Sequence, residues 1–314
     1  MSICDARRPG QDQHGPGRPR VVALLASHLG DEDRLWKLER CLQSIAAQEE
    51  PPAEVLVRWS AAGAELEAQA CELLDGCGLP CALTAWRAEP AAQFEHYAAL
   101  GSRLLSGRPA AELDEAWLIF SDDDDIWHPR RAAHFSRAAA AAAGCGGLAA
   151  GVFRDARPRD PGARPRSAGD VEALLRSGLA EQTGDTELMG AGFRLEYFHY
   201  CVRPALLAAF LQRAPAALLS SPYCDLALAE FARLASWANG PPPLHDPGRD
   251  DWMYYARWRT TTAARAPTPG RSRAASRGRP RSAASRSTAR TSRPWASPRR
   301  TRCGPWPGCA RTWT

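Results

Sequence analysis

Short apolar runs alternate with amphipathic segments along the first 130 residues of the chain. Four segments are predicted to be strands: Val21–Ser27, Glu54–Trp59, Cys81–Trp86 and Ala116–Phe120. The first is continuously apolar, as expected of a parallel strand buried on both faces. Three segments between them carry apolar residues at helical spacing: Arg34–Gln48, Glu65–Leu74 and Gln93–Leu105. This alternation predicts an α/β fold with a Rossmann-like, mostly parallel sheet flanked by helices.

The second half of the chain has a weaker pattern of the same kind. A strand is expected over Glu196–Val202, and helices are expected over Arg131–Ala143, Pro204–Arg213 and Asp225–Trp237. The Pro-, Arg- and Asp-rich segment 154–170 is predicted to be a loop. From Pro241 to Trp258 we expect irregular structure.

Charge divides the chain into two parts. The segment Trp252–Thr314 has 15 arginines and no acidic residue, whereas the whole chain carries +5, so residues 1–251 carry −10. Beyond Trp258 almost no aliphatic residue remains to form a core, and disorder is expected. We therefore predict a disordered leader over residues 1–19, one folded domain over 20–258 and a disordered Arg/Ser/Pro-rich tail over 259–314.

The tail has three competing explanations: a basic arm for nucleic acid, an inert solvated tail, or an out-of-frame translation. We favour the third because acidic residues, leucine and valine disappear abruptly, and we assign the tail no function. An acidic body makes a nucleic-acid partner improbable. Neither a signal peptide nor a membrane-spanning run is evident, and the ten cysteines form no CxxC pair, so a cytoplasmic location is expected.

The segment most informative about chemistry is Trp117–Arg131, WLIFSDDDDIWHPRR. Its four adjacent carboxylates follow an apolar strand directly, at the end of a parallel strand where open α/β sheets bind ligands. Repelling carboxylates stay ionised in a partly buried site only beside a cation or strong hydrogen-bond donors. Carboxylate oxygens suit Mg²⁺ or Mn²⁺, bound together with substrate phosphates. A solvated acidic turn is the simpler alternative.

Three segments together resemble the family 2 glycosyltransferases, which have the GT-A fold. Val21–His28 is similar to the family's first strand and its base-contacting turn. Leu38–Gln48 (LERCLQSIAAQ) resembles its first helix, and Ile119–Pro129 (IFSDDDDIWHP) resembles its "fLDxDDxwxP" signature. The resemblance covers Val21–Trp258 and is strongest up to Arg131.

This resemblance implies a divalent metal, Mn²⁺ or Mg²⁺, that binds the diphosphate of a nucleotide-sugar donor. It places Asp122 and Asp124 at the DxD positions, with Asp124 as the direct metal ligand and Asp122 contacting ribose or metal-bound water. Asp123 replaces either one if the alignment shifts by one residue. His245 is a further candidate metal ligand. Ser27 and His28 are candidates for contacting the nucleotide.

An inverting transferase also requires a general base for the acceptor hydroxyl. By position the resemblance implies Asp225, with Glu230 as second choice, and the alternative for Asp225 is a helix N-cap. The family has an acid after its second strand where this chain reads Arg58-Trp59-Ser60. Ser60 aligns with the family's serine, and base recognition falls to Trp59 or to the turn at Ser27.

The leading functional hypothesis is a metal-dependent transfer of sugar from a nucleotide-diphosphate sugar, a UDP-sugar by resemblance, to an acceptor hydroxyl of unknown identity. A non-catalytic GT-A-like protein that binds nucleotide-sugars is one alternative. A nucleotidyltransferase is another, although the turn Ser27–Gly30 lacks the Gly-rich loop of those enzymes. Glu95 and His96 lie on a predicted helix and are expected at the surface.

Overall fold

The computed structural model describes residues 19–142, 148–151, 155–160, 162–183, 197–237, 244–245 and 254–255. The chain divides into two compact units, Met1–Thr262 and Ala263–Thr314, and all described residues belong to the first. The leader expected over residues 1–19, apart from Pro19, and the tail expected over 259–314 lie outside the described residues.

The main sheet of the described part has seven strands in the order β10-β6-β9-β4-β1-β2-β3. Their bounds are β1 Arg20–Leu29, β2 Glu54–Ala61, β3 Ala82–Arg87, β4 Ala116–Asp122, β6 Leu148–Gly151, β9 Tyr200–Val202 and β10 Leu244–His245. The pairs β4-β1, β1-β2 and β2-β3 are parallel, whereas β9 runs antiparallel to β4 and β6. The sheet is therefore mostly parallel, as the sequence predicts.

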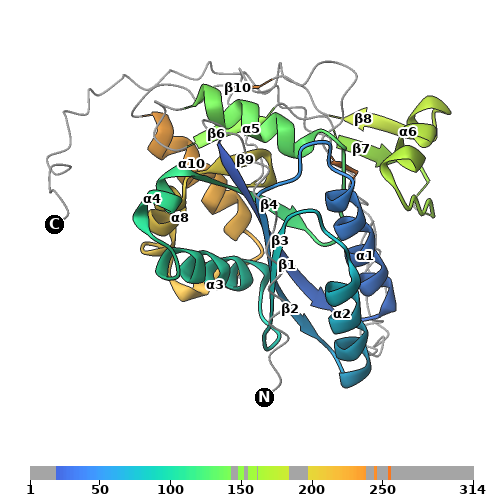
Figure 1. Cartoon of the computed structure of the whole chain (residues 1–314), viewed down its shortest axis with the longest axis horizontal. Helices are drawn as coiled ribbons and strands as arrows, with labels where there is room; N and C mark the ends of the chain where they lie inside the picture. The colour runs from blue at the N-terminus through green and yellow to red at the C-terminus, as the bar shows by residue number, and fades with distance from the viewer. Residues whose placement is uncertain are drawn as a thin grey trace, which may run out of the picture. The chain divides into compact units, whose positions relative to one another are not determined.

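Helices cover both faces of this sheet. Their bounds are α1 Glu32–Ala46, α2 Ala64–Gly76, α3 Gln93–Ser106, α4 Ala110–Glu115, α5 Arg131–Ala141, α8 Pro204–Leu211, α9 Ala216–Leu219 and α10 Cys224–Trp237, with a 3-10 turn η1 at Tyr197–His199. Figure 1 shows α1 and α2 on one side of β1 and β2, with α3 and α8 on the other. None of the described helices has the length and apolar character that crossing a membrane requires.

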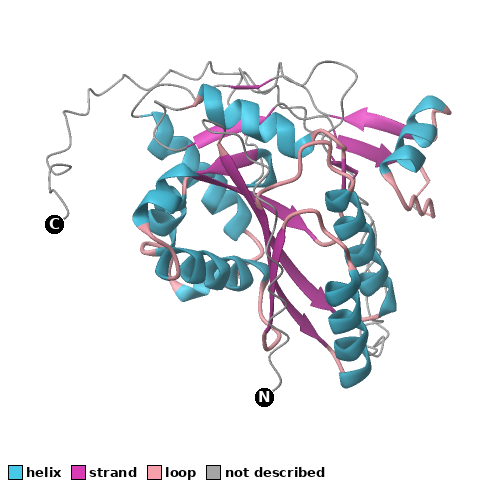
Figure 2. Cartoon of the chain, in the orientation of Figure 1, coloured by secondary structure: helices cyan, strands magenta, loops and turns pink. Residues whose placement is uncertain are grey.

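A second, smaller sheet has the order β5-β11-β7-β8, with β5 Ile126–Trp127, β7 Asp155–Pro158, β8 Ala180–Thr183 and β11 Tyr254–Tyr255. Helix α6 (Ala168–Arg176) packs on β7 and β8, and its Val171 is buried with Ile126 and Ala156. Figure 2 shows α6 beside the antiparallel strands β7 and β8. Because β5 follows the four aspartates directly, this sheet is joined to the carboxyl end of β4.

The predicted elements of the first half are confirmed, but several details of the pattern are wrong. The segment 154–170, expected as a loop, contains β7 and the start of α6, because its strand pairs antiparallel with the distant β8. Of the strand expected at Glu196–Val202, Tyr197–His199 is the 3-10 turn η1, and only Tyr200–Val202 is a strand. The irregular segment after Pro241 includes two-residue strands, which long-range pairing stabilises and local sequence does not reveal.

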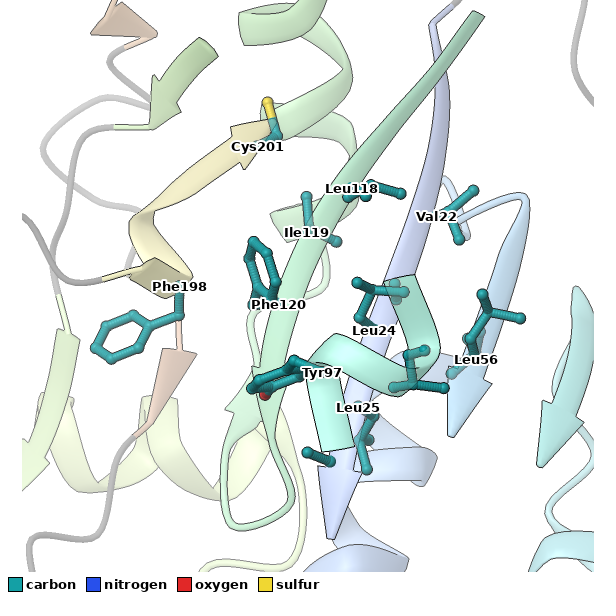
Figure 3. Close-up of a cluster of buried hydrophobic side chains, with 14 of the residues drawn as sticks. Val22, Leu24, Leu25, Leu56, Tyr97, Leu118, Ile119, Phe120, Phe198 and Cys201 are labelled. Atoms are coloured by element: carbon teal, nitrogen blue, oxygen red, sulfur yellow. The ribbon is translucent and has the colours of Figure 1, made fainter. Parts of the chain in front are cut away.

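The core lies on both faces of β1 and β4. Residues Val22, Ala23, Leu24 and Leu25 of β1 and Leu118, Ile119 and Phe120 of β4 are fully buried. Figure 3 shows Leu24, Leu56, Phe120 and Tyr97 gathered where α3 crosses the sheet. A strand buried on both faces explains why these runs are continuously apolar rather than alternating.

Replacing Leu24 tests this packing. Leu24→Ala removes a fully buried side chain and is expected to lower the free energy of unfolding by about 2–5 kcal/mol, from lost burial and the cavity that remains. The matched control is Leu179→Ala, because Leu179 is 54% exposed and its truncation is expected to cost at most about 0.5 kcal/mol. Urea unfolding measures both. Equal losses in the two variants would contradict the description of the core.

Candidate functional site

The carboxyl ends of β1, β2 and β4 bring the predicted site residues to one edge of the sheet. In the parallel register Ala26 of β1 lies between Arg58 of β2 and Asp122 of β4, and His28 lies opposite Ser60. The imidazole Nδ1 of His28 is 2.8 Å from the Ser60 hydroxyl oxygen, so the two strand ends are joined by side chains as well. Ligands of open α/β sheets bind at such an edge.

Asp122 faces helix α3. Its Oδ1 accepts hydrogen bonds from the Gln93 amide and from the Tyr197 hydroxyl, and Gln93 Nε2 also lies 3.1 Å from the Tyr197 oxygen. Gln93 is the first residue of α3, whereas Tyr197 opens η1, far along the chain. Two donors from separate elements thus hold the first carboxylate of the cluster in place.

Asp123 faces the opposite side, toward helix α1, and is 1% exposed. Its Oδ2 accepts a hydrogen bond of 2.6 Å from the Ser27 hydroxyl, and its Oδ1 lies 2.6 Å from Nη2 of Arg34. The hydroxyl of Ser27, a predicted nucleotide contact, is therefore engaged with a carboxylate of the cluster. Asp122 is the last residue of β4, and Asp123 lies in the turn that follows it.

Arg34 also binds the third carboxylate. Its Nη1 lies 2.9 Å from Oδ2 of Asp124, whose side chain is 25% exposed. Arg34 stands in the first turn of α1. The N-cap of this helix is Asp31, whose side chain accepts a 2.9 Å hydrogen bond from the Arg34 backbone amide. Burial lowers the pKa of Arg34, but the charges of Asp123 and Asp124 outweigh this and raise it above its ordinary value.

Burial and mutual repulsion perturb the carboxylates themselves. Burial raises the pKa of Asp122, and the charge of Asp124 raises it further, while the hydrogen bonds from Tyr197 and Gln93 act in the opposite direction. Burial likewise raises the pKa of Asp123, against the lowering effect of Arg34. Desolvated carboxylates with shifted pKa values are typical of functional sites.

Buried side chains hold the backbone at Ser121, the residue before the aspartates, through hydrogen bonds and aromatic packing. The Ser121 hydroxyl accepts a hydrogen bond of 2.9 Å from the Trp127 indole, and the Ser121 carbonyl accepts one of 2.7 Å from the Tyr97 hydroxyl. Tyr197 packs edge-on against Phe94 and Phe120, at 5.1 and 5.6 Å between ring centroids. Trp127 therefore packs beneath the aspartate cluster, and aromatic side chains in contact with one another support the end of β4.

Two residues on the side of the site expected to contact the nucleotide base, Trp59 and His96, are buried, which the sequence does not suggest. Trp59 is completely buried in the core. His96, expected at the surface, is 1% exposed, because the first turn of α3 packs against the ends of β1 and β2. No described group forms a hydrogen bond with either ring nitrogen of His96. Burial, together with the charges of Arg58 and His28, lowers the pKa of His96 to about 4.

Asp225 is the second residue of α10 and accepts a 2.6 Å hydrogen bond from the Leu226 amide. Its helix begins close to Ser220, whose hydroxyl donates to Glu95 at 2.8 Å. Glu95 stands in the same first turn of α3 that brings Gln93 to Asp122. The second choice, Glu230, is half-buried further along α10. No described hydrogen bond or ion pair joins Asp225 to the aspartates.

His245 lies in β10, whose backbone pairs with β6 at the far edge of the main sheet. Its side chain is outside the described part of the structure.

The sequence interpretation did not single out Arg34, Gln93 or Tyr197 as partners of the aspartates. For Arg34 a signal existed: a cation in the first turn of a helix is disfavoured by the helix dipole unless an anion compensates it. For Tyr197 none existed, because only the chain fold brings it to Asp122.

Within the described residues, no group of three or more His, Cys, Asp or Glu side chains is placed to hold a metal ion. The oxygen chemistry of Asp122 and Asp124 nevertheless suits Mg²⁺ or Mn²⁺. Two carboxylates suffice where the remaining ligands are water and substrate phosphates. The residues present therefore fit a metal that binds together with a phosphorylated ligand, rather than one held by protein ligands alone.

Comparison of the chain with protein-family profiles and with curated proteins finds no match. Solved structures similar to it include residues 1–349 of S. aureus TarS, with 14% identity and a TM-score of 0.46, over 75% of this chain and 60% of that one. The TarS fragment in complex with UDP-GlcNAc has 15% identity and a TM-score of 0.45, over 75% and 58%.

The mannosyltransferase PcManGT from Pyrobaculum calidifontis, in complex with GDP-Man and Mn²⁺, has 15% identity and a TM-score of 0.45, over 82% of this chain and 61% of that one. This chain thus spans less than two thirds of each of these structures. Similarity at this level does not identify the family or the substrate of the chain.

The burial of His96 predicts a specific dependence of stability on pH. Its pKa is about 4 in the folded chain against an ordinary 6.5, so between these values the unfolded chain binds a proton that the folded chain does not. Its contribution to stability is complete above pH 6.5 and falls on acidification by on the order of 1 kcal/mol per pH unit.

Urea unfolding of the wild type and of His96→Leu at pH 7 and pH 5 measures this contribution. The variant is expected to lose less stability than the wild type between the two pH values. An equal loss in both proteins would show that His96 is protonated normally in the folded state.

Proposed function

We propose that the chain is a metal-dependent glycosyltransferase that moves sugar from a nucleotide-diphosphate sugar to an acceptor hydroxyl. The observation that carries this proposal is the aspartate cluster, which stands at the carboxyl end of β4 beside the ends of β1 and β2. The family 2 resemblance of Leu38–Gln48 and Ile119–Pro129 supports the same assignment. The catalytic unit is placed within residues 20–258.

In this proposal Asp124 is the direct metal ligand and Asp122 contacts the ribose or a metal-bound water. Asp124 lies in the turn after β4, and 25% of its side chain is exposed. When bound, the metal acts as a Lewis acid that neutralises the negative charge of the departing nucleoside diphosphate. Gln93 and Tyr197 fix the orientation of Asp122, so the cluster is arranged before the donor enters.

The nucleotide is assigned to the ends of β1 and β2, where His28 is exposed and its ring is hydrogen-bonded to Ser60. Trp59 is buried, so recognition of the base falls to the turn after β1. A UDP-sugar is the donor that the resemblance implies.

Asp225 is assigned as the base that accepts the proton of the acceptor hydroxyl, which implies inversion at the sugar carbon. Its support is the position of α10, which is joined through Ser220 and Glu95 to the turn of α3 that contacts Asp122. The hydrogen bond from the Leu226 amide holds the carboxylate at the start of the helix.

Removing the charge of Asp124 tests the donor site. Asp124→Asn is expected to abolish Mn²⁺-dependent binding of UDP or GDP while the thermal unfolding temperature stays near that of the wild type. The control is Asp75→Asn, which removes the same charge from an exposed position on α2. Calorimetric titration of nucleotide in Mn²⁺ measures the effect, and full binding by Asp124→Asn would refute its assignment as metal ligand.

Removing the charge of Asp225 separates catalysis from binding. Asp225→Asn is expected to leave nucleotide binding unchanged and to lower sugar transfer by roughly 10²–10⁴-fold, the usual contribution of a general base. Glu230→Gln, on the same helix, is the matched variant and is expected to retain transfer. Release of nucleoside diphosphate from the donor in the presence of acceptor is the assay. Unchanged release with Asp225→Asn would remove this residue from the mechanism, and release abolished only in Glu230→Gln would make Glu230 the base.

A further inference from the structure

Arg34 joins two carboxylates of the aspartate cluster with one guanidinium. Nη2 lies 2.6 Å from Asp123 and Nη1 lies 2.9 Å from Asp124. Its side chain is 27% exposed, so these contacts are partly shielded from water. In the first turn of α1 a cation is disfavoured by the helix dipole, and the two carboxylates compensate that cost.

The same contact occupies one of the two carboxylate oxygens of the proposed metal ligand. Asp124 offers its Oδ2 to Arg34, and a divalent cation bound to this carboxylate would stand close to a fixed positive charge. Two cations so near one another repel strongly where water screens them poorly. Arg34 and the metal therefore compete for Asp124.

We propose that Arg34 is the internal counter-cation of the aspartate cluster, and that a divalent metal binds Asp124 only when Arg34 releases it. This inference rests on the proposed function, because that function makes Asp124 the metal ligand. In the free protein the guanidinium offsets part of the negative charge of Asp123 and Asp124, and the affinity for metal alone is low.

The donor diphosphate gives Arg34 a second partner. A planar guanidinium forms paired hydrogen bonds with phosphate oxygens as well as with carboxylates. Asp123 is buried and fixed by Ser27, so Arg34 can keep this contact while it exchanges Asp124 for a phosphate. Metal and nucleotide then strengthen each other's binding, by the reciprocity of linked equilibria. Arg34 is thus a positioning residue that makes metal binding depend on the donor.

Binding of Mn²⁺ alone gives the most direct test, because a diphosphate itself chelates Mn²⁺. Electron paramagnetic resonance of free Mn²⁺ measures its affinity for the full chain without nucleotide. Arg34→Gln is expected to bind Mn²⁺ at least about tenfold more tightly than the wild type, because the competing charge is gone. Arg213→Gln removes an exposed arginine at the end of α8, whose side chain bonds the Ala209 carbonyl, and is expected to match the wild type.

Arg34→Lys is the second variant, and it tests the proposal by itself if Arg34→Gln does not fold. A lysine keeps the charge but lacks the fork that reaches both carboxylates at once, so its Mn²⁺ affinity is expected to lie a few-fold above the wild type. Unchanged or weaker Mn²⁺ affinity in a folded Arg34→Gln, or in Arg34→Lys where the glutamine variant does not fold, overturns the proposal.

Addition of UDP or GDP distinguishes this inference from the proposed function. If the wild type binds neither nucleotide in Mn²⁺, the proposed function is refuted. The competition between Arg34 and the metal for Asp124 is then still tested by the affinity of the variants for Mn²⁺ alone. If wild type binds nucleotide but Arg34→Gln shows no gain in Mn²⁺ affinity, the proposed function stands and the role of Arg34 is refuted. A gain in Mn²⁺ affinity with weaker nucleotide binding in Arg34→Gln supports both.

Discussion

Repulsion among four consecutive carboxylates is the constraint on which the arrangement around β4 depends. Aspartates at positions 122–125 follow a strand buried on both faces, and two of them are almost completely buried. Charges so close in a medium of low polarity are unstable unless donors or cations surround them. Helix α1 supplies a guanidinium and β1 a hydroxyl, while α3 and η1 supply an amide and a phenol. These elements therefore meet at the carboxyl end of β4, where their side chains compensate the negative charge of the aspartates.

The order of strands explains how elements so distant in sequence converge. Because β1, β2, β3 and β4 run parallel, helices α1 and α3, which follow β1 and β3, both begin at the carboxyl edge of the sheet. The antiparallel β9 then brings η1 back beside β4, so that Tyr197 reaches Asp122 across 75 residues of chain. Deleting donors from any one element leaves a carboxylate undercompensated, which links the packing of the fold to the electrostatics of the site.

Much of this fold is predictable from the sequence, because continuous apolar runs and helical periodicity are local signals. The strands β1, β2, β3 and β4 and the helices α1, α2 and α3 follow from those signals, whereas the short helix α4 is not predicted. The strand at Asp155–Pro158 does not, since it exists through pairing with β8, and a Pro- and Arg-rich segment lacks the apolar pattern. In the site, the aspartate cluster stands out as a pattern of charge. The residues that bind the aspartates do not stand out, because Gln93 and Tyr197 have ordinary sequence surroundings. His96 is buried because α3 packs on the sheet, and no spacing of residues predicts this burial.

The central claim is that the carboxyl edge of this sheet binds a nucleoside diphosphate through a divalent metal. Calorimetric titration of UDP, and then of GDP, into the wild-type chain tests it most directly, once in Mn²⁺ and once in EDTA. The account predicts saturable binding of at least one nucleotide in Mn²⁺ and its loss in EDTA. Binding of equal strength in EDTA, or no binding of either nucleotide to a chain shown to be folded, would contradict it.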